Sequence, residues 1–215
     1  VISPDGTTIA FTYKGDIYTV PVAGGRAMQI TTNPAYDTAP VWSPDSKRIA
    51  FASDRMGSLD VYIVAKDGGE PRRLTTHSGS ETPLAFTDAG HVLFSAGIMP
   101  SAEAVVFPSN GQFNQVYRVS VEGGRPTMIS SMPMECISIN KEGAMLYQDK
   151  KGYEDYWRKH HVSPIARDIW MYTPGKEPQY RQLTTFGGED REPVWAPDGK
   201  TFYYLSEENG SFNIY

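Results

Sequence analysis

The fold is decided by the stretch SPDSKRIAF at residues 43–51, because the chain repeats it. Nearly the same stretch, SPDGTTIAF, occupies residues 3–11, and a third copy, APDGKTFYY, occupies residues 196–204. Weaker copies are FTDAGHVLF at residues 86–94 and INKEGAMLY at residues 139–147. Self-similarity at a spacing of roughly 40 to 57 residues indicates an array of repeated structural units.

Further blocks follow each copy in a constant order. The first ends in an aromatic residue: Asp16-Ile17-Tyr18, Asp60-Val61-Tyr62, Gln115-Val116-Tyr117, Asp168-Ile169-Trp170 and Asn213-Ile214-Tyr215. Three times a glycine pair comes next: Gly24-Gly25, Gly68-Gly69 and Gly123-Gly124. A short apolar segment then closes on two hydroxyl residues: Thr31-Thr32, Thr75-Thr76, Ser130-Ser131 and Thr184-Thr185. Several independent blocks in one order indicate a repeated unit of four strands.

Each block has a physical interpretation. Pro-Asp-Gly is turn chemistry, because Pro fixes φ, Asp bonds the backbone ahead and Gly accepts positive φ. The flanking runs are short and rich in β-formers, which is typical of strands. In the second copy we expect strands at residues 40–42, 49–51, 61–64 and 73–75. Four antiparallel strands repeated at this spacing predict an all-β fold, a β-propeller of four-stranded blades.

We expect one propeller over residues 1–215, with blades near residues 1–32, 33–76, 77–131, 132–185 and 186–215. Two copies are longer between their second and third strands, at residues 97–114 and 150–167, and such insertions form surface loops that often carry binding. The first copy lacks its first strand and the last stops within its third. The ring is therefore incomplete, and we expect the chain to be part of a longer polypeptide with further blades.

Composition excludes several classes of protein. The net charge is −5, and no basic stripe of the kind that binds nucleic acid is present. No apolar run is long enough to span a bilayer. Cys136 is the only cysteine, so an internal disulfide is excluded, and its setting predicts a buried, unreactive thiol. We expect no cofactor.

The motifs of a nucleophile elbow, a phosphate-binding loop, a zinc protease or an EF-hand are absent, so we assign no catalytic residue to this chain. The adjacent His160 and His161 could suggest a metal. Neighbouring residues of an extended segment point to opposite sides, however, so we predict no metal site. Together with Tyr153, Trp157 and Arg158 they instead favour a contact loop for a neighbouring domain or a ligand.

Acidic residues precede the first strand of three repeats, namely Asp37, Glu81 and Asp190. Because the first strand of a blade starts beside the central channel, these acids could surround its mouth and attract a cationic group such as the amino end of a peptide. The alternative is structural, with the acids capping turns and bonding backbone amides. This second interpretation is the one we favour.

The chain resembles a known family in these residues. Val41-Trp42-Ser43-Pro44-Asp45, with Asp60-Val61-Tyr62 and Arg73-Leu74-Thr75-Thr76, is similar to the propeller repeat of TolB and of tricorn-type proteases. The opening segment at residues 2–18 and the insertion at residues 153–170 resemble the N-terminal propeller of bacterial tricorn-like serine peptidases. The resemblance implies a six-bladed propeller followed by a seven-bladed one, a PDZ domain and a catalytic part, with the propellers gating access to the active site.

The resemblance implies a non-catalytic module of a secreted or periplasmic serine peptidase that guides peptides and supports assembly. Its partners would be downstream domains of the same polypeptide and peptides, with a second copy of the chain as a further candidate. Two alternatives stay open: a TolB-like protein-interaction propeller, and the propeller cap of a prolyl-oligopeptidase-type hydrolase. The incomplete ring disfavours the first alternative, and the insertion at residues 150–167 disfavours the second.

Overall fold

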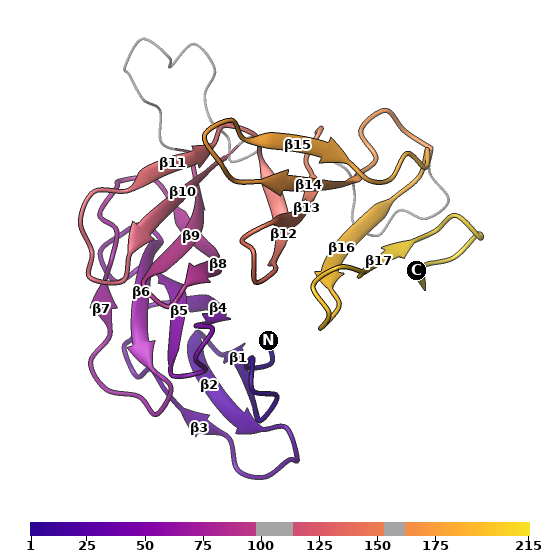
Figure 1. The fold of residues 1–215 in the computed structure, drawn as a ribbon. Coiled ribbons are helices and arrows are strands. Elements are labelled where there is room, and N and C mark those ends of the chain that lie inside the picture. The colour runs from indigo at the N-terminus through magenta and orange to yellow at the C-terminus, as the bar shows by residue number, and fades with distance from the viewer. Residues whose placement is uncertain (98–113, 153–161) are drawn as a thin grey trace. The chain divides into compact units, whose positions relative to one another are not determined.

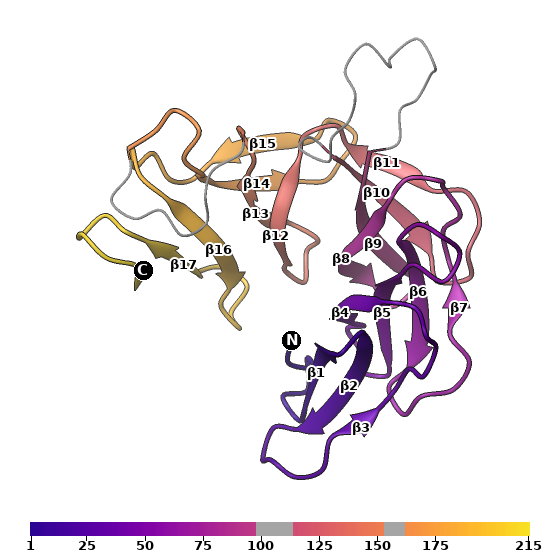
Figure 2. The same ribbon diagram turned by 180° about the vertical axis from the view of Figure 1, so that it is seen from behind.

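The computed structural model describes residues 1–97, 114–152 and 162–215 (Figures 1 and 2). Every regular element in these residues is a β-strand, and the strands form five antiparallel sheets. The sheets follow the five sequence repeats, which confirms the predicted all-β fold of four-stranded blades. The chain divides into two compact units, Val1–Met132 and Pro133–Tyr215.

The first unit holds three sheets, each built from strands consecutive in sequence. The strands of the first sheet are β1 (Thr8–Tyr13), β2 (Asp16–Pro21) and β3 (Met28–Gln29). The second sheet contains β4 (Asp37–Trp42), β5 (Arg48–Ser53), β6 (Asp60–Ala65) and β7 (Arg72–Arg73). In the third are β8 (Glu81–Asp88), β9 (His91–Ala96), β10 (Gln115–Ser120) and β11 (Thr127–Ser130). Strand β4 contacts both β1 and β8, so the sheets meet through their first strands.

The second unit holds two sheets of the same design. One consists of β12 (Met134–Ile139), β13 (Met145–Asp149), β14 (Ile169–Thr173) and β15 (Gln179–Gln182). The other contains β16 (Asp190–Trp195), β17 (Phe202–Ser206) and β18 (Asn213–Ile214). The two insertions fall between second and third strands, as predicted: β9 ends at Ala96 before β10 begins at Gln115, and β13 ends at Asp149 before β14 begins at Ile169.

The Pro-Asp turns have the predicted chemistry. Oδ1 of Asp45 accepts hydrogen bonds from the Ser43 hydroxyl at 2.5 Å and from the Lys47 amide at 3.1 Å. Oγ of Ser43 in turn accepts the Arg48 amide at 2.9 Å. The carboxyl of Asp5 makes the matching bonds in the first repeat, and the hydrogen bond from Ser3 is the main cause that lowers its pKa to about 2. The conformation of the turn is thus stabilised by hydrogen bonds to side chains of the turn itself.

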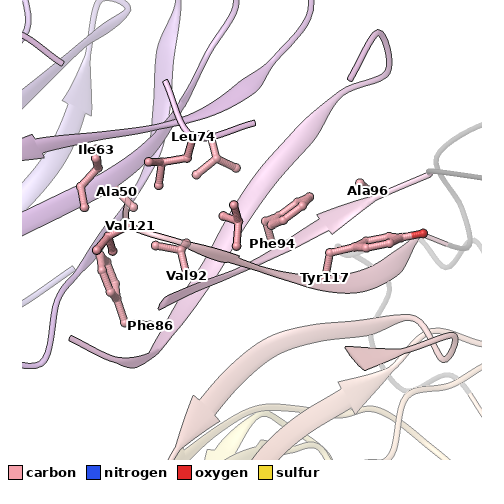
Figure 3. Close-up of a cluster of buried hydrophobic side chains, with 11 residues drawn as sticks. Ala50, Ile63, Leu74, Phe86, Val92, Phe94, Ala96, Tyr117 and Val121 are labelled. Atoms are coloured by element: carbon pink, nitrogen blue, oxygen red, sulfur yellow. The ribbon is translucent and has the colours of Figure 1, made fainter. Parts of the chain in front are cut away.

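The core of the first unit lies between neighbouring sheets. One cluster joins the second and third sheets and combines aliphatic residues with Phe86, Phe94 and Tyr117 (Figure 3). A second cluster joins the first and second sheets around Trp42 and Phe51. Burial of each large apolar side chain contributes about 1.5 to 3 kcal/mol, so these clusters supply most of the stability between sheets.

The aromatic residues that end the repeated sequence blocks pair across neighbouring strands in the first three sheets. The ring of Phe11 stacks on Tyr18 at a centroid distance of 5.8 Å, and Phe51 stacks on Tyr62 at 5.9 Å. In the third sheet Phe94 stacks on Tyr117 at 5.6 Å. Offset aromatic pairs stabilise beyond their buried area, which explains why both blocks of the repeat end in an aromatic residue.

The first strands β4, β12 and β16 each carry a bulge in which a non-glycine residue has positive φ. Ala39, Cys136 and Glu192 occupy matching positions of β4, β12 and β16, with φ between 51° and 55°. Cys136 therefore lies in a strand, but the bulge turns this residue outward and leaves it exposed. The residue is therefore more exposed than predicted, because strand character alone does not locate a bulge. Desolvation nevertheless raises the pKa of the Cys136 thiol to about 11, which agrees with the predicted low reactivity.

A hydroxyl clasp ties the fourth segment of a repeat to its third strand. In the second repeat the buried Thr75 hydroxyl oxygen accepts the Val61 amide at 2.9 Å. The same bond joins Thr31 to the Ile17 amide and Thr184 to the Ile169 amide, each at 2.9 Å. These threonines are the first members of the hydroxyl pairs in the sequence. Their role explains why a threonine follows the apolar residue in these repeats.

We predict that Thr75→Val destabilises the first unit by about 1 to 3 kcal/mol, because it keeps the side-chain shape but leaves the buried Val61 amide without its acceptor. The matched control is Thr76→Val at the exposed neighbouring hydroxyl, which should change stability by less than about 0.5 kcal/mol. Urea unfolding measures both. Equal effects of the two substitutions would contradict the clasp.

Candidate functional site

The three predicted acidic site residues are the first residues of their strands, and all are buried. The exposed fraction is 0% for Asp37 and 1% for Glu81 and Asp190. The amide of Asp37 donates to the Gly15 carbonyl of the preceding sheet at 2.7 Å. The structure therefore places these residues in the seams between neighbouring sheets.

The same backbone bond recurs at the other two acids. The Glu81 amide donates to the Leu59 carbonyl at 2.6 Å, and the Asp190 amide donates to the Arg167 carbonyl at 3.0 Å. In each case the acceptor carbonyl belongs to the residue before an aspartate. That aspartate is the first residue of β2 and of β6, and it lies directly before β14. We name this bond, from the first residue of a sheet to the sheet before it, the seam bond. The seam bond joins one repeat to the next. Whether the three carboxyl groups contribute to ligand binding stays a prediction.

Asp37 is neutralised by an arginine of its own repeat. The guanidinium of Arg55, in the connection between β5 and β6, lies 2.8 Å from Oδ2 of Asp37. It also lies over the rings of Tyr62 and Phe51, at 5.0 Å and 5.5 Å from their centroids. A cation held between a carboxylate and two aromatic faces is strongly positioned. The ion pair is almost fully buried, since the Arg55 side chain is only 11% exposed.

Glu81 faces a different environment. Its carboxyl lies beside that of Asp60, whose charge is balanced by Arg73 at 2.8 Å. The pKa of Glu81 is raised to about 7, with burial as the largest cause and the charge of Asp60 adding to the rise. The hydroxyl of Thr75 partly offsets this rise. The protonated form of this carboxyl is therefore favoured much more strongly than that of an exposed glutamate.

Asp190 is the corresponding acid of the second unit. Burial raises its pKa, whereas hydrogen bonds with Ser206 and Thr184 lower it in part. The carboxyls of Asp168 and Glu208 add to the rise. Desolvation thus outweighs hydrogen bonding at this seam.

A second cluster lies at the base of the insertion at residues 150–167, and sequence reasoning missed it. Nζ of Lys150 lies 2.9 Å from Oε1 of Glu135 in β12. The guanidinium of Arg167 bridges Glu135 at 3.6 Å and Glu189 at 3.1 Å. Lys150 and Arg167 flank the insertion on its two sides, so these ion pairs hold both of its ends against β12 and the segment before β16. We name this cluster the anchor network.

The anchor network continues on its buried side. Lys151 pairs with Asp168 and donates to the Ala166 carbonyl at 2.8 Å. Oδ1 of Asp149 accepts the Asp168 amide at 2.9 Å, and Oδ2 accepts the Trp170 indole at 3.1 Å. Basic residues at both ends of an insertion, directly after one strand and just before the next, were the signal that could have revealed this network in the sequence.

The contact loop predicted from the sequence cannot be placed in the same way. Tyr153, Trp157, Arg158, His160 and His161 all lie outside the described residues. The residues of the anchor network nearest to them in sequence, on either side, are described by the structure. Their binding role stays a prediction.

The first unit also contains a cavity of about 890 Å³ between its second and third sheets. Its lining includes Arg73, His77, Glu81, Tyr117 and Arg125. Charged groups of both signs and one aromatic ring share this surface. The cavity gives solvent a path toward Glu81.

Across residues 1–97, 114–152 and 162–215, no three His, Cys, Asp or Glu side chains lie close enough to hold a metal ion. In the same part of the chain, no helix has the length and apolar character needed to cross a membrane.

Repeated four-stranded antiparallel sheets that meet through their first strands define a β-propeller. The chain belongs to the family described as the tricorn protease N-terminal beta propeller domain, which it matches over residues 2–215. This family is the one that the sequence repeats and the insertion had suggested.

Individual relatives agree with this family. The chain is 24% identical over 213 residues to tricorn protease homolog 1 of Streptomyces coelicolor, a match that covers 99% of this chain and 19% of that protein. Among solved structures it is similar to the tricorn protease, with a TM-score of 0.72, 19% identity and coverage of 98% of this chain and 20% of that one. A putative TolB from Agrobacterium tumefaciens gives a TM-score of 0.71 at 18% identity, covering 95% of this chain and 68% of that one. The chain thus spans about a fifth of the length of its tricorn relatives.

We predict that Arg55→Met destabilises the first unit by about 3 kcal/mol, because it leaves the Asp37 carboxylate buried without its cation. The double variant Arg55→Met with Asp37→Asn should recover part of this loss. Urea unfolding measures each free energy.

The matched control is Glu122→Gln, which removes the Arg72–Glu122 pair, whose side chains are 49% and 74% exposed. An exposed pair contributes less than about 1 kcal/mol. If Arg55→Met cost no more than Glu122→Gln, the Asp37 ion pair would have no structural importance.

Proposed function

We propose that this propeller is a non-catalytic module of a larger secreted or periplasmic tricorn-like serine peptidase, in which it guides or gates peptide substrates and supports assembly. The observation that carries the proposal is the family match over residues 2–215, together with the small share of a tricorn homologue that the chain spans. Downstream domains of the same polypeptide would supply the catalytic residues.

The anchor network supports a role for the insertion in this function. Ion pairs from Glu135 and Glu189 hold the two flanks of residues 150–167. Pairs that are partly buried position side chains more firmly than exposed ones. A firmly held base suits a loop that contacts a neighbouring domain or a passing peptide, and aromatic and arginine residues such as Trp157 and Arg158 are enriched at such contacts.

The test uses the whole natural polypeptide and two substrates, a long unstructured peptide and a short fluorogenic peptide. We expect Trp157→Ala with Arg158→Ala to lower kcat/KM for the long peptide by about tenfold and to leave the short one unchanged. Gating acts on entry, so a substrate small enough to bypass the propeller does not report it.

The matched control is Met56→Ala. Met56 is 66% exposed in the corresponding connection of the second repeat, which has no insertion. This variant should behave like the unaltered protein with both substrates. An equal loss on both substrates, or no loss on either, would contradict gating by the insertion. A polypeptide without any peptidase activity would instead favour the TolB-like interaction propeller.

A further inference from the structure

The first residue of the first strand is buried in each of the second to fifth sheets, but its chemical type differs between them. The first residues of β4, β8, β12 and β16 are Asp37, Glu81, Met134 and Asp190. Met134 is 3% exposed, so the position is buried whether its residue is acidic or apolar. The presence of methionine shows that this position accepts a neutral side chain.

The charges around Glu81 do not balance. Three buried carboxyls lie near this end of the first unit, those of Asp37, Asp60 and Glu81. Arg55 pairs with Asp37 and Arg73 pairs with Asp60, each at 2.8 Å. Both arginines are therefore committed to the two aspartates, and the third carboxyl is left without a cation among the described residues.

The elements packed around Glu81 supply no other neutralising group. Asp60 of β6 faces it with a like charge, and the Thr75 hydroxyl and His77 amide face it from the connection before β8. None of these reaches either carboxyl oxygen with the geometry of a full hydrogen bond. On β9 the residue opposite is Ala96.

The remaining charged groups on the surrounding elements are exposed or already paired. In the turn between β10 and β11, Glu122 and Arg125 line the same cavity, but both are exposed. Glu122 is paired with Arg72. The connection at residues 97–114 contains no lysine, arginine or histidine in its sequence, so it brings no cation to this site.

We propose that the junction between the second and third sheets is proton-linked, with Glu81 carrying a proton when the sheets are packed and the junction opening when that proton is lost. The proton makes Glu81 electrically equivalent to Met134 at the matching position. Glu81 also lines the neighbouring cavity, so a local opening is enough to bring its buried carboxyl into contact with solvent. Opening would expose Leu74 and Tyr117, which line the cavity and belong to the core between the sheets.

The sign of the pH dependence follows from the packed and open states. Burial raises the pKa of Glu81 from 4.5 to about 7 in the packed state. The packed junction is therefore fully stabilised below about pH 4.5, and this stabilisation is lost as the pH rises through 7. With these two pKa values the opening equilibrium shifts toward the open state roughly tenfold between pH 6 and pH 8.

Amide hydrogen exchange, corrected for the intrinsic effect of pH, measures the opening. We expect the protection factors of amides that bond across the junction, above all the Glu81 amide on the Leu59 carbonyl, to fall roughly tenfold between pH 6 and pH 8. In Glu81→Gln and in Glu81→Met, which copies the fourth repeat, they should not depend on pH. A wild-type pH profile in Glu81→Gln would overturn the proposal.

Two controls separate Glu81 from its neighbours. His77→Gln removes the one histidine that lines the cavity, and Glu122→Gln removes the exposed acid. Both should keep the wild-type pH dependence, and its loss in His77→Gln would assign the switch to the histidine instead.

A measurement on the unaltered protein does not depend on the folding of any variant. The ¹³C resonances of the glutamate carboxyls report their protonation one by one. We expect one glutamate to titrate with a midpoint near pH 7. If every glutamate titrated below about pH 5.5, within the ordinary range, Glu81 would hold no proton at neutral pH and the proposal would fall.

Discussion

The seam bond is the interaction on which the rest of the structure depends. A four-stranded sheet buries only part of its apolar surface by itself, so each repeat must pack on its neighbour. The amides of Asp37, Glu81 and Asp190 fix that packing, because each donates to a carbonyl of the preceding sheet that lies just before β2, β6 or β14. Once this register is set, the apolar clusters between neighbouring sheets come into contact.

Burying an acidic residue between sheets costs desolvation free energy, and the repeats offset this cost in different ways. A buried carboxylate needs a cation, several hydrogen bonds or a proton. Asp37 has Arg55, whereas burial raises the pKa of both Glu81 and Asp190. The second unit adds the anchor network, which commits several charged groups to the base of one insertion. Repeats that share a backbone plan therefore differ in their electrostatics, and such differences allow one fold to carry different properties at each seam.

Much of this fold could be predicted from the sequence, because it resides in local signals. The Pro-Asp turns, the aromatic ends of strands and the hydroxyl pairs each act within one repeat, and the structure places them as expected. The partners of the buried charges could not be predicted in this way. The ion pair of Arg55 with Asp37 depends on the pairing of separate strands. The same holds for the ion pairs of Arg167 with Glu135 and Glu189. The exposure of Cys136 could not be predicted for a related reason, since a bulge depends on the register between two strands.

Native-state hydrogen exchange at pH 6 in low denaturant tests the importance of the seam bond most directly. If the seam bond joins the repeats into one cooperative structure, the Asp37 and Glu81 amides should exchange with the same free energy of opening as the Ile17 and Val61 amides, which bond to the threonine clasps inside single repeats. Exchange of Asp37 and Glu81 through a much smaller opening, while Ile17 and Val61 stay protected, would show that the sheets separate easily and would contradict the account.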